Sequence, residues 1–150
     1  MKVSDLIQKE NTCGFSFEVP PPLKGKGITQ IYNTIDRLRE FNPLYINITT
    51  HRSEFVFKSN DDGTYQRVSE RSRPGTVAVA AAIQQKYGIP AVPHIICSGF
   101  SKIETEYALI DLNFLGIETS YYYVVTKQNM KIALCQMKMD ILTPVNCKTK

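Results

Sequence analysis

Short apolar runs alternate along the chain with longer stretches of helical periodicity. The run Phe15–Val19 alternates and ends at three prolines, which cannot donate to a strand ladder, so it predicts a strand with Glu18 at its carboxyl end. Residues 44–49 and 91–97 are rich in β-branched and aromatic side chains and have the length of strands. Residues 121–125 predict a fourth strand for the same reason.

Two helices are predicted between the first three strands. From residue 28 to 41 the apolar residues recur at the spacing of one helical face, and the helix must end at Asn42 because a residue before proline disfavours the α region. Residues 77–87 are alanine-rich and predict a helix that packs closely on a sheet, with Gly88 placed to cap its end.

A third helix is predicted to begin near Lys102, since Ser101 and Glu104 have the spacing of a capping box. We expect Gly116 to end it. Its expected packing face consists of four apolar residues at helical spacing: Ile103, Tyr107, Ile110 and Phe114.

The resulting order, β-α-β-α-β-α-β, predicts an α/β protein with parallel strands and right-handed crossovers. Neither G-x-G-x-x-G nor G-x-x-x-x-G-K-[ST] occurs, and Lys24–Gly27 is too short to match either, so a nucleotide-binding doubly wound fold is not favoured. A (β/α)₈ barrel needs no such signature but takes about 250 residues, so these units would form less than half of one.

The polar segment 50–75 interrupts this alternation. It contains Asp61-Asp62-Gly63 at its middle and is predicted to be a long loop. Long loops in compact domains are usually functional. The alternative for residues 51–73 is a solvated loop without a role, because charge-rich runs usually are solvated.

Length and composition favour one domain in the cytoplasm. The chain has 150 residues, 43% of them hydrophobic, within the size of a single compact domain. No apolar run approaches the roughly 18 residues of a membrane span, so no membrane association is predicted. The N-terminal stretch is too polar for a secretory signal.

The net charge of +4 comes from the tail. Residues 1–120 hold 13 basic and 13 acidic residues, whereas residues 121–150 hold five lysines and one aspartate. A nucleic-acid partner is therefore not favoured. The cysteines are far apart and lack metal-ligand spacing, so we expect reduced thiols and no metal site at Cys13, Cys97, Cys135 and Cys147.

Several ordered segments resemble one known family. They are Phe15-Ser16-Phe17-Glu18 with the following prolines, residues 45–55, Arg73-Pro74-Gly75-Thr76, Pro93-His94-Ile95-Ile96-Cys97, and residues 104–117. Together they resemble the methylenetetrahydrofolate reductases over residues 1 to about 118. The resemblance implies a (β/α)₈ TIM barrel, of which this chain would carry an incomplete N-terminal part.

The resemblance also implies an activity. Family members use NADH or NADPH to reduce FAD, which passes a hydride to 5,10-methylenetetrahydrofolate to give 5-methyltetrahydrofolate for one-carbon metabolism and methionine synthesis. The protein supplies binding and electrostatics while the flavin supplies the hard chemistry. Glu18 matches the general acid that opens the methylene bridge to an iminium. From the residues alone, a hydrated or salt-bridged glutamate at a strand end remains the alternative. For a full-length member of the family, the resemblance leaves assembly into a homo-oligomer open.

Four further residues match cofactor-binding positions of the family. Thr49 and Thr50 match the end of the second strand, which meets flavin and nicotinamide, and Arg52 falls in the flavin-contacting turn after it. Thr50 replaces an aromatic residue and Arg52 a small one, so contact through their backbone is expected rather than side-chain chemistry. His94 matches a flavin-contacting histidine, with a hydrogen-bonded core histidine as the alternative.

The tail departs from the family, whose hydrophobic fourth strand ends in Arg-Gly-Asp, where this chain has Tyr121-Tyr122-Tyr123-Val124-Val125-Thr126. A shifted reading frame joins the last base of each codon to the first two bases of the next codon. In that frame the junctions Tyr123/Val124, Val124/Val125 and Val125/Thr126 can encode Arg, Gly and Asp, in that order. We therefore hypothesise that residues 119–150 are translated out of frame, after a single-base insertion or deletion near codons 117–120.

Three functions remain as alternatives. The first is a flavin-dependent folate reductase, represented by part of its barrel. The second is a non-catalytic fragment of that enzyme. The third, ranked last because residues 1–120 are neutral, is a small basic binding protein.

Overall fold

A computed structural model describes residues 3–9, 14–51, 53–96, 101–125 and 130–136, with only the backbone for Lys9 and from Tyr123 onward. Its main sheet has five strands in the order β1-β2-β5-β6-β7. The first four strands are parallel, and β7 runs antiparallel to β6. The strands are β1 (Ser16–Val19), β2 (Tyr45–Ile48), β5 (Ala91–Ile96), β6 (Thr119–Val125) and β7 (Met130–Gln136). The predicted α/β class, parallel pairing and part of a barrel-type fold are confirmed.

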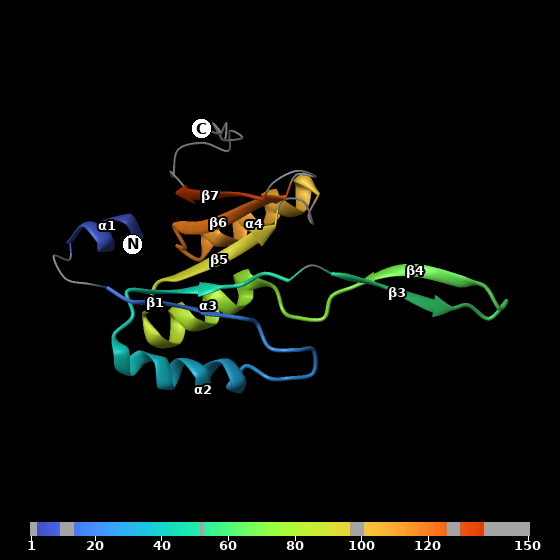
Figure 1. Cartoon of the computed structure of the whole chain (residues 1–150), viewed down its shortest axis with the longest axis horizontal. Coiled ribbons are helices and arrows are strands. Elements are labelled where there is room, and N and C mark those ends of the chain that lie inside the picture. The colour runs from blue at the N-terminus through green and yellow to red at the C-terminus, as the bar shows by residue number, and fades with distance from the viewer. Residues whose placement is uncertain (1–2, 10–13, 52, 97–100, 126–129, 137–150) are drawn as a thin grey trace.

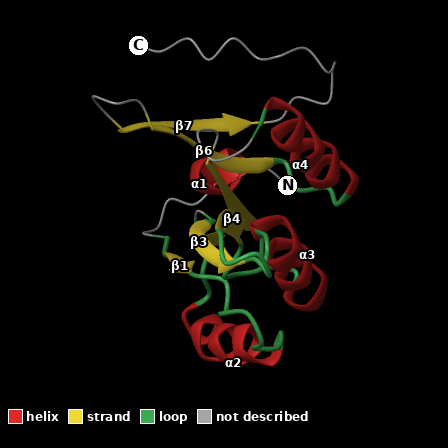
Figure 2. Ribbon diagram, turned by 90° about the vertical axis from the view of Figure 1, so that its right-hand side faces the viewer, coloured by secondary structure: helices red, strands yellow, loops and turns green. Residues whose placement is uncertain are grey.

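Three helices connect the parallel strands and cover one face of the sheet (Figures 1 and 2). They are α2 (Thr29–Leu38), extended by a 3₁₀ turn at Arg39–Phe41, α3 (Thr76–Tyr87) and α4 (Lys102–Phe114). One apolar core lies between helices and sheet and includes Val19, Ile31, Ile35, Ile46, Ile48, Val79, Ala80, Ile83, Ile95 and Leu112. Because side chains alternate along a strand, Glu18, Asn47 and His94 lie on the opposite face.

The helix boundaries follow the predicted local signals. Asn42 adopts a left-handed conformation with φ of 48° directly before Pro43, which ends the first helical segment. Gly88, with φ of 66°, caps α3. The capping box is present in both directions, since the Glu104 amide donates to the Ser101 hydroxyl and the Ser101 amide to the Glu104 carboxylate.

The predicted packing face of α4 is wrong. The side chains of Ile103, Tyr107 and Phe114 are 58%, 62% and 87% exposed. The helix instead buries Leu112 and packs Ala108, Leu109 and Leu115 against the core. Both stripes have helical spacing, and the one containing the small Ala108 lets the helix approach closely. The outer stripe is therefore left exposed to solvent.

The predicted loop at 50–75 is also wrong, because it contains a β-hairpin of β3 (Glu54–Ser59) and β4 (Tyr65–Glu70). The hairpin projects from the body of the molecule (Figure 1). The amide of Asn60 donates to the carbonyl of Thr64 at 2.8 Å and closes the turn, where Gly63 has φ of 80°. Charged residues inside its strands hid the alternation from a reading based on hydrophobicity.

Two more elements were not predicted. The helix α1 (Val3–Lys9) lies beside the start of β6, where the Val3 amide donates to the Thr119 hydroxyl at 3.3 Å. The strand β7 breaks the alternation of strand and helix after β6. Among the described helices, none combines the length and apolar character that crossing a membrane requires. Cys13, Cys97 and Cys147 lie outside the described residues, as does the side chain of Cys135.

Candidate active site

The carboxyl ends of β1, β2 and β5 meet at one edge of the sheet, the edge at which parallel α/β folds place their sites. Glu18 on β1 is paired in register with Asn47 on β2, and Asn47 with Val92 on β5. His94 follows two residues later on the same face of β5. The alternation of the strands therefore gathers an acid, an amide and an imidazole on the face that the helices do not cover.

Glu18 is solvent-exposed and held by Thr49. The Thr49 hydroxyl donates a 2.6 Å hydrogen bond to Oε1 of Glu18. The Thr49 amide also donates to the Val19 carbonyl at 3.1 Å, which fixes the end of β2 against the end of β1. The carboxylate is thus oriented by a neighbouring strand, as a positioned acid or base requires.

His94 lies beside this pair in the interior, with 3% of its surface exposed. Burial lowers the pKa of its imidazole, and the Glu18 carboxylate opposes that shift. The ring meets that of Tyr121 edge to face, with centroids 5.3 Å apart. The Thr76 hydroxyl donates to the His94 carbonyl at 2.9 Å and ties α3 to this point of β5. Burial therefore favours the neutral form of the His94 imidazole, and the Thr76 contact holds the backbone of β5 at this point.

Asn47 was missed at the sequence level. Its Oδ1 is buried and has no hydrogen-bond partner among the described residues. A buried acceptor without a partner is costly, so it marks a place for a donor from outside the chain. The signal was available in the sequence, because Asn47 stands between two core isoleucines and must face the same side as Glu18.

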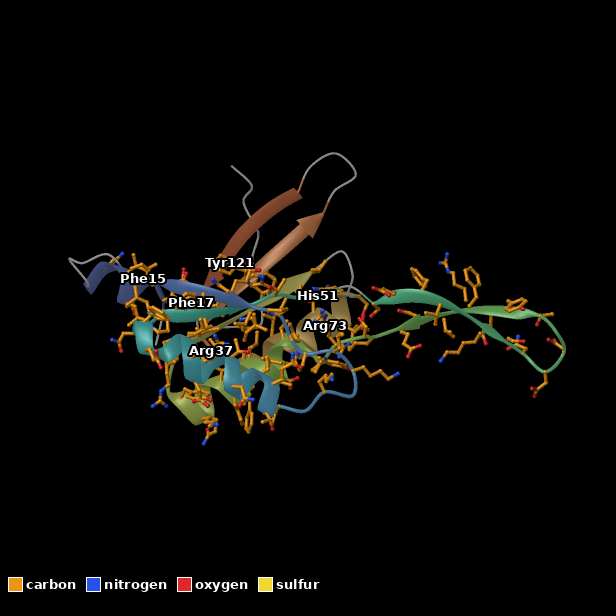
Figure 3. The ribbon with its side chains drawn as sticks, turned by 60° about the horizontal axis from the view of Figure 1, so that its bottom comes forward. Phe15, Phe17, Arg37, His51, Arg73 and Tyr121 are labelled. Atoms are coloured by element: carbon orange, nitrogen blue, oxygen red, sulfur yellow. The ribbon has the colours of Figure 1, made fainter. Side chains whose placement is uncertain are left out.

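Thr50 lies apart from this group. It lines a small cavity of about 40 Å³ at the N-terminus of α3, together with His51, Ser53, Arg71, Arg73, Pro74, Gly75, Thr76 and Ile96. The Arg73 guanidinium donates to the carbonyl of Pro21 and so joins the loop after β1 to the loop before α3. Figure 3 shows His51 and Arg73 where the hairpin leaves the body. Arg52 lies outside the described residues.

Of the predicted site residues, Glu18, Thr49 and His94 come together, and Thr50 lies in the adjoining cavity. The fold and this edge of the sheet define a class of protein: part of a parallel α/β barrel with a polar site at the carboxyl ends of its strands. The family model for methylenetetrahydrofolate reductase matches residues 2–120. The chain belongs to that family, as the sequence resemblance predicted. No curated protein matches the chain.

Family membership supports a methylenetetrahydrofolate reductase-type role, an oxidoreductase role in folate chemistry. The match stops at residue 120, the second residue of β6 and close to the boundary expected from the sequence.

Proposed function

We propose that the family portion of this chain takes part in the reduction of 5,10-methylenetetrahydrofolate to 5-methyltetrahydrofolate, with FAD as the bound cofactor and NADH or NADPH as the reductant. The observation that carries the proposal is the convergence of Glu18, Thr49 and His94 at the edge of a barrel-type sheet in a chain of this family. The cytoplasmic location stays a prediction.

Glu18 is the proton donor in this proposal. Thr49 holds Oε1, so the proton is carried on Oε2. It passes to N10, the one of the two bridged folate nitrogens that the methylene carbon leaves. The bond from that nitrogen to the methylene carbon then breaks and leaves an iminium. The iminium carbon accepts a hydride and becomes the methyl group. Glu18 ends the step ionised and takes a proton from water before the next turnover.

In this proposal the polar face of the sheet would hold the flavin ring. The unpartnered Asn47 Oδ1 would accept from a ring N–H, and His94 and Thr49 would hold the ring beside the acid. Thr50 would contact the cofactor at the adjoining loop. When bound, FAD supplies the hydride transfer. The neutral state of His94 avoids placing a cation beside the proton donor.

The test uses the purified full chain and its Glu18→Gln variant. We expect both proteins to bind FAD, seen as flavin absorbance, and NADH to bleach that absorbance in both. Addition of methylenetetrahydrofolate should then reoxidise the flavin of the unmodified chain. The same reaction should be at least about a hundredfold slower in the Glu18→Gln variant. Glu40→Gln, an exposed glutamate after α2, is the matched control and should react normally. Equal reoxidation by the Glu18→Gln variant would contradict the role of Glu18.

A second candidate is a non-catalytic fragment of the same enzyme, favoured by three structural features from α4 onward. The antiparallel β7 replaces the expected crossover helix, and the outer stripe of α4 stays exposed. Ser120 is fully buried, yet its Oγ has no partner among the described residues. These features support an out-of-frame origin for residues 119–150.

The coding DNA tests this candidate. We expect a single-base change near codons 117–120, followed downstream by the family's second half in another frame. Restoring the frame should then yield a chain that complements a methionine auxotroph, while the unmodified chain does not. An uninterrupted frame with no family sequence downstream would reject the out-of-frame origin, and complementation by the unmodified chain would reject the fragment.

A further inference from the structure

The cavity beside Thr50 is lined by cationic and neutral polar side chains. None of the described residues that line it is acidic. Its polar members are Thr50, His51, Ser53, Arg71, Arg73 and Thr76. Guanidinium groups only donate hydrogen bonds, and hydroxyl groups can donate them. A cavity of this composition therefore favours an anion that accepts several hydrogen bonds.

The β3–β4 hairpin brings this lining together. Glu54 pairs with Glu70 at the foot of the hairpin, so the next residues outward, Ser53 and Arg71, leave the two strands beside each other. The segment after β2 and the loop before α3 supply the other polar groups, and Figure 3 shows Arg73 in that loop. The foot of the hairpin thus gathers cationic groups that are distant in the sequence.

The chain itself positions Arg73 at the cavity. The Arg73 guanidinium donates to the carbonyl of Pro21 in the loop after β1. A guanidinium carries five N–H donors in a fixed fork, so this bond leaves other donors for a ligand. Because the side chain is held before a ligand arrives, binding costs less conformational entropy.

Arg71 lies beside the N-terminus of α3. Its Nη1 is 3.6 Å from the point where a Cβ on Gly75, the N-cap residue, would stand. No side chain caps α3 there, and its first turn contains no acidic residue. The first amides of a helix carry partial positive charge, which here adds to the charge of the guanidinium.

Glu104 does not neutralise this charge. Its carboxylate accepts from the Ser101 amide at 2.7 Å within the capping box of α4. The Ser101 contacts lower the pKa of Glu104 most, and Arg71 lowers it less. Among the described residues, neither Arg71 nor Arg73 forms an ion pair. Two positive charges therefore line the cavity without a paired carboxylate.

The volume of the cavity limits the anion that fits. The cavity measures about 40 Å³. One water-sized group needs roughly 10–15 Å³ of such space, so about three fit. A phosphate monoester presents three terminal oxygens and about two negative charges. A diphosphate linkage, with two phosphorus centres, is larger, and an adenine or flavin ring is larger still.

We propose that this cavity is a subsite for a phosphate monoester, and that NADPH supplies this group as its 2′-phosphate. The identity of the ligand rests on the proposed function, which it deepens. NADPH carries a monoester, whereas NADH and FAD carry only the diphosphate linkage. Thr50 lines the cavity and directly follows Thr49, so the subsite adjoins the site of hydride transfer. In other dinucleotide-binding proteins an arginine likewise accommodates the 2′-phosphate.

Binding of NADPH and NADH to the purified full chain, without added FAD, tests the ligand. The fluorescence of the reduced nicotinamide reports binding. We expect NADPH to bind at least about tenfold tighter than NADH, because hydrogen bonds between charged groups are the strong ones. Arg71→Gln should reduce this preference to less than about threefold and leave NADH binding unchanged.

Arg67→Gln is the matched control. Arg67 lies on the same strand of the hairpin, where its guanidinium stacks on Phe55 outside the cavity, so its variant should keep the preference for NADPH. Equal binding of NADPH and NADH by the unmodified chain would overturn NADPH as the source of the phosphate. A preference that survives in Arg71→Gln, or that is lost equally in Arg67→Gln, would overturn the assignment to this cavity.

Inorganic phosphate tests the subsite without a nucleotide. Thermal unfolding is measured in phosphate and in chloride at equal ionic strength. Phosphate stabilises proteins generally through exclusion from their surface, and this effect should be the same in all three chains. Binding at the subsite should add a further rise in Tm to the unmodified chain and to Arg67→Gln, but not to Arg71→Gln.

An equal rise in the three chains would overturn the subsite. An extra rise that depends on Arg71, without a preference for NADPH, would keep the phosphate subsite and reject NADPH as its ligand. Neither measurement requires flavin reduction. The two results are therefore independent of the Glu18→Gln test, and a failure of the proposed chemistry can be told apart from a failure of the subsite.

Discussion

The Thr49 hydroxyl donates to Oε1 of Glu18 at 2.6 Å and so links the carboxyl ends of two neighbouring strands. The contact joins residues 31 apart in the sequence and depends only on the parallel pairing of β1 and β2. A carboxylate on a four-residue strand is thereby given one orientation toward the open face of the sheet. The pair is the first contact in the site to test on its own.

Thr49→Val should slow folate reduction by about tenfold, because loss of this hydrogen bond frees the Glu18 carboxylate to turn away from its position. The free energy of unfolding should change by less than about 1 kcal/mol, since Glu18 is exposed. Steady-state rates and urea unfolding of the two proteins give both values. Thr49→Ser keeps the hydroxyl and should retain the rate; a serine variant as slow as the valine variant would contradict the role of the hydrogen bond.

Much of this architecture could be predicted because its signals are local. Each of three such signals depends on residues a few positions apart. They are the prolines that follow β1 at Val19, the Asn42-Pro43 pair that ends the helical segment after α2, and the Ser101–Glu104 capping box. The site residues Glu18, Thr49 and His94 could be named from the family resemblance. Their proximity follows from parallel pairing, which brings strand ends to one edge.

The missed features depend on long-range partners. The choice between the two apolar stripes of α4 is made by the sheet it packs on, and periodicity within the helix cannot decide it. The hairpin was missed because Lys58 and Arg67 interrupt its hydrophobic pattern, although its turn closes around Asn60 and Thr64. The face of Asn47 could be inferred from its place between Ile46 and Ile48, whereas its register with Glu18 comes from the structure.

His94 should make the stability of the chain depend on pH. Burial lowers the pKa of its imidazole in the folded protein below the value near 6.5 of the unfolded chain. A lowered histidine pKa means that the folded state prefers the neutral form. Its contribution is fully present above about pH 6.5 and is lost as the pH falls toward the folded-state pKa.

We therefore expect the free energy of unfolding to fall as the pH drops below about 6.5, and the His94→Asn variant to lose part of that dependence. Urea unfolding at several pH values measures the slope. His51→Asn, which replaces an exposed histidine, is the matched control and should keep the slope of the unmodified chain. A slope unchanged in His94→Asn would show that other groups cause it.

Thr76→Val should destabilise the fold by about 1–2 kcal/mol. The Thr76 hydroxyl makes a buried 2.9 Å hydrogen bond to the His94 carbonyl, and valine leaves that acceptor unsatisfied. Thermal and urea unfolding report the loss. Thr34→Val is the control, since the Thr34 hydroxyl bonds the Gln30 carbonyl on an exposed face of α2, and we expect a change within about 0.5 kcal/mol. Equal effects of the two substitutions would contradict a special role for the link between α3 and β5.

Ser120→Ala should stabilise the chain. The side chain of Ser120 is fully buried, and its Oγ has no partner among the described residues, so folding removes the hydroxyl from water without replacing its hydrogen bonds. Alanine keeps the Cβ and removes that penalty, which predicts a gain of about 1 kcal/mol in the free energy of unfolding. Ser69→Ala on the exposed hairpin should change it by less than about 0.5 kcal/mol.

The Ser120 result also bears on the origin of the tail. A strand selected for this position would place an apolar side chain against the core, as the other helix-facing positions of the sheet do at Val19, Ile48 and Ile95. A gain in Ser120→Ala fits a strand that is poorly adapted to this core from the point where the family match ends. If the alanine variant is instead less stable than the unmodified chain, the hydroxyl contributes to the native fold, and the case for an out-of-frame β6 loses its support from packing.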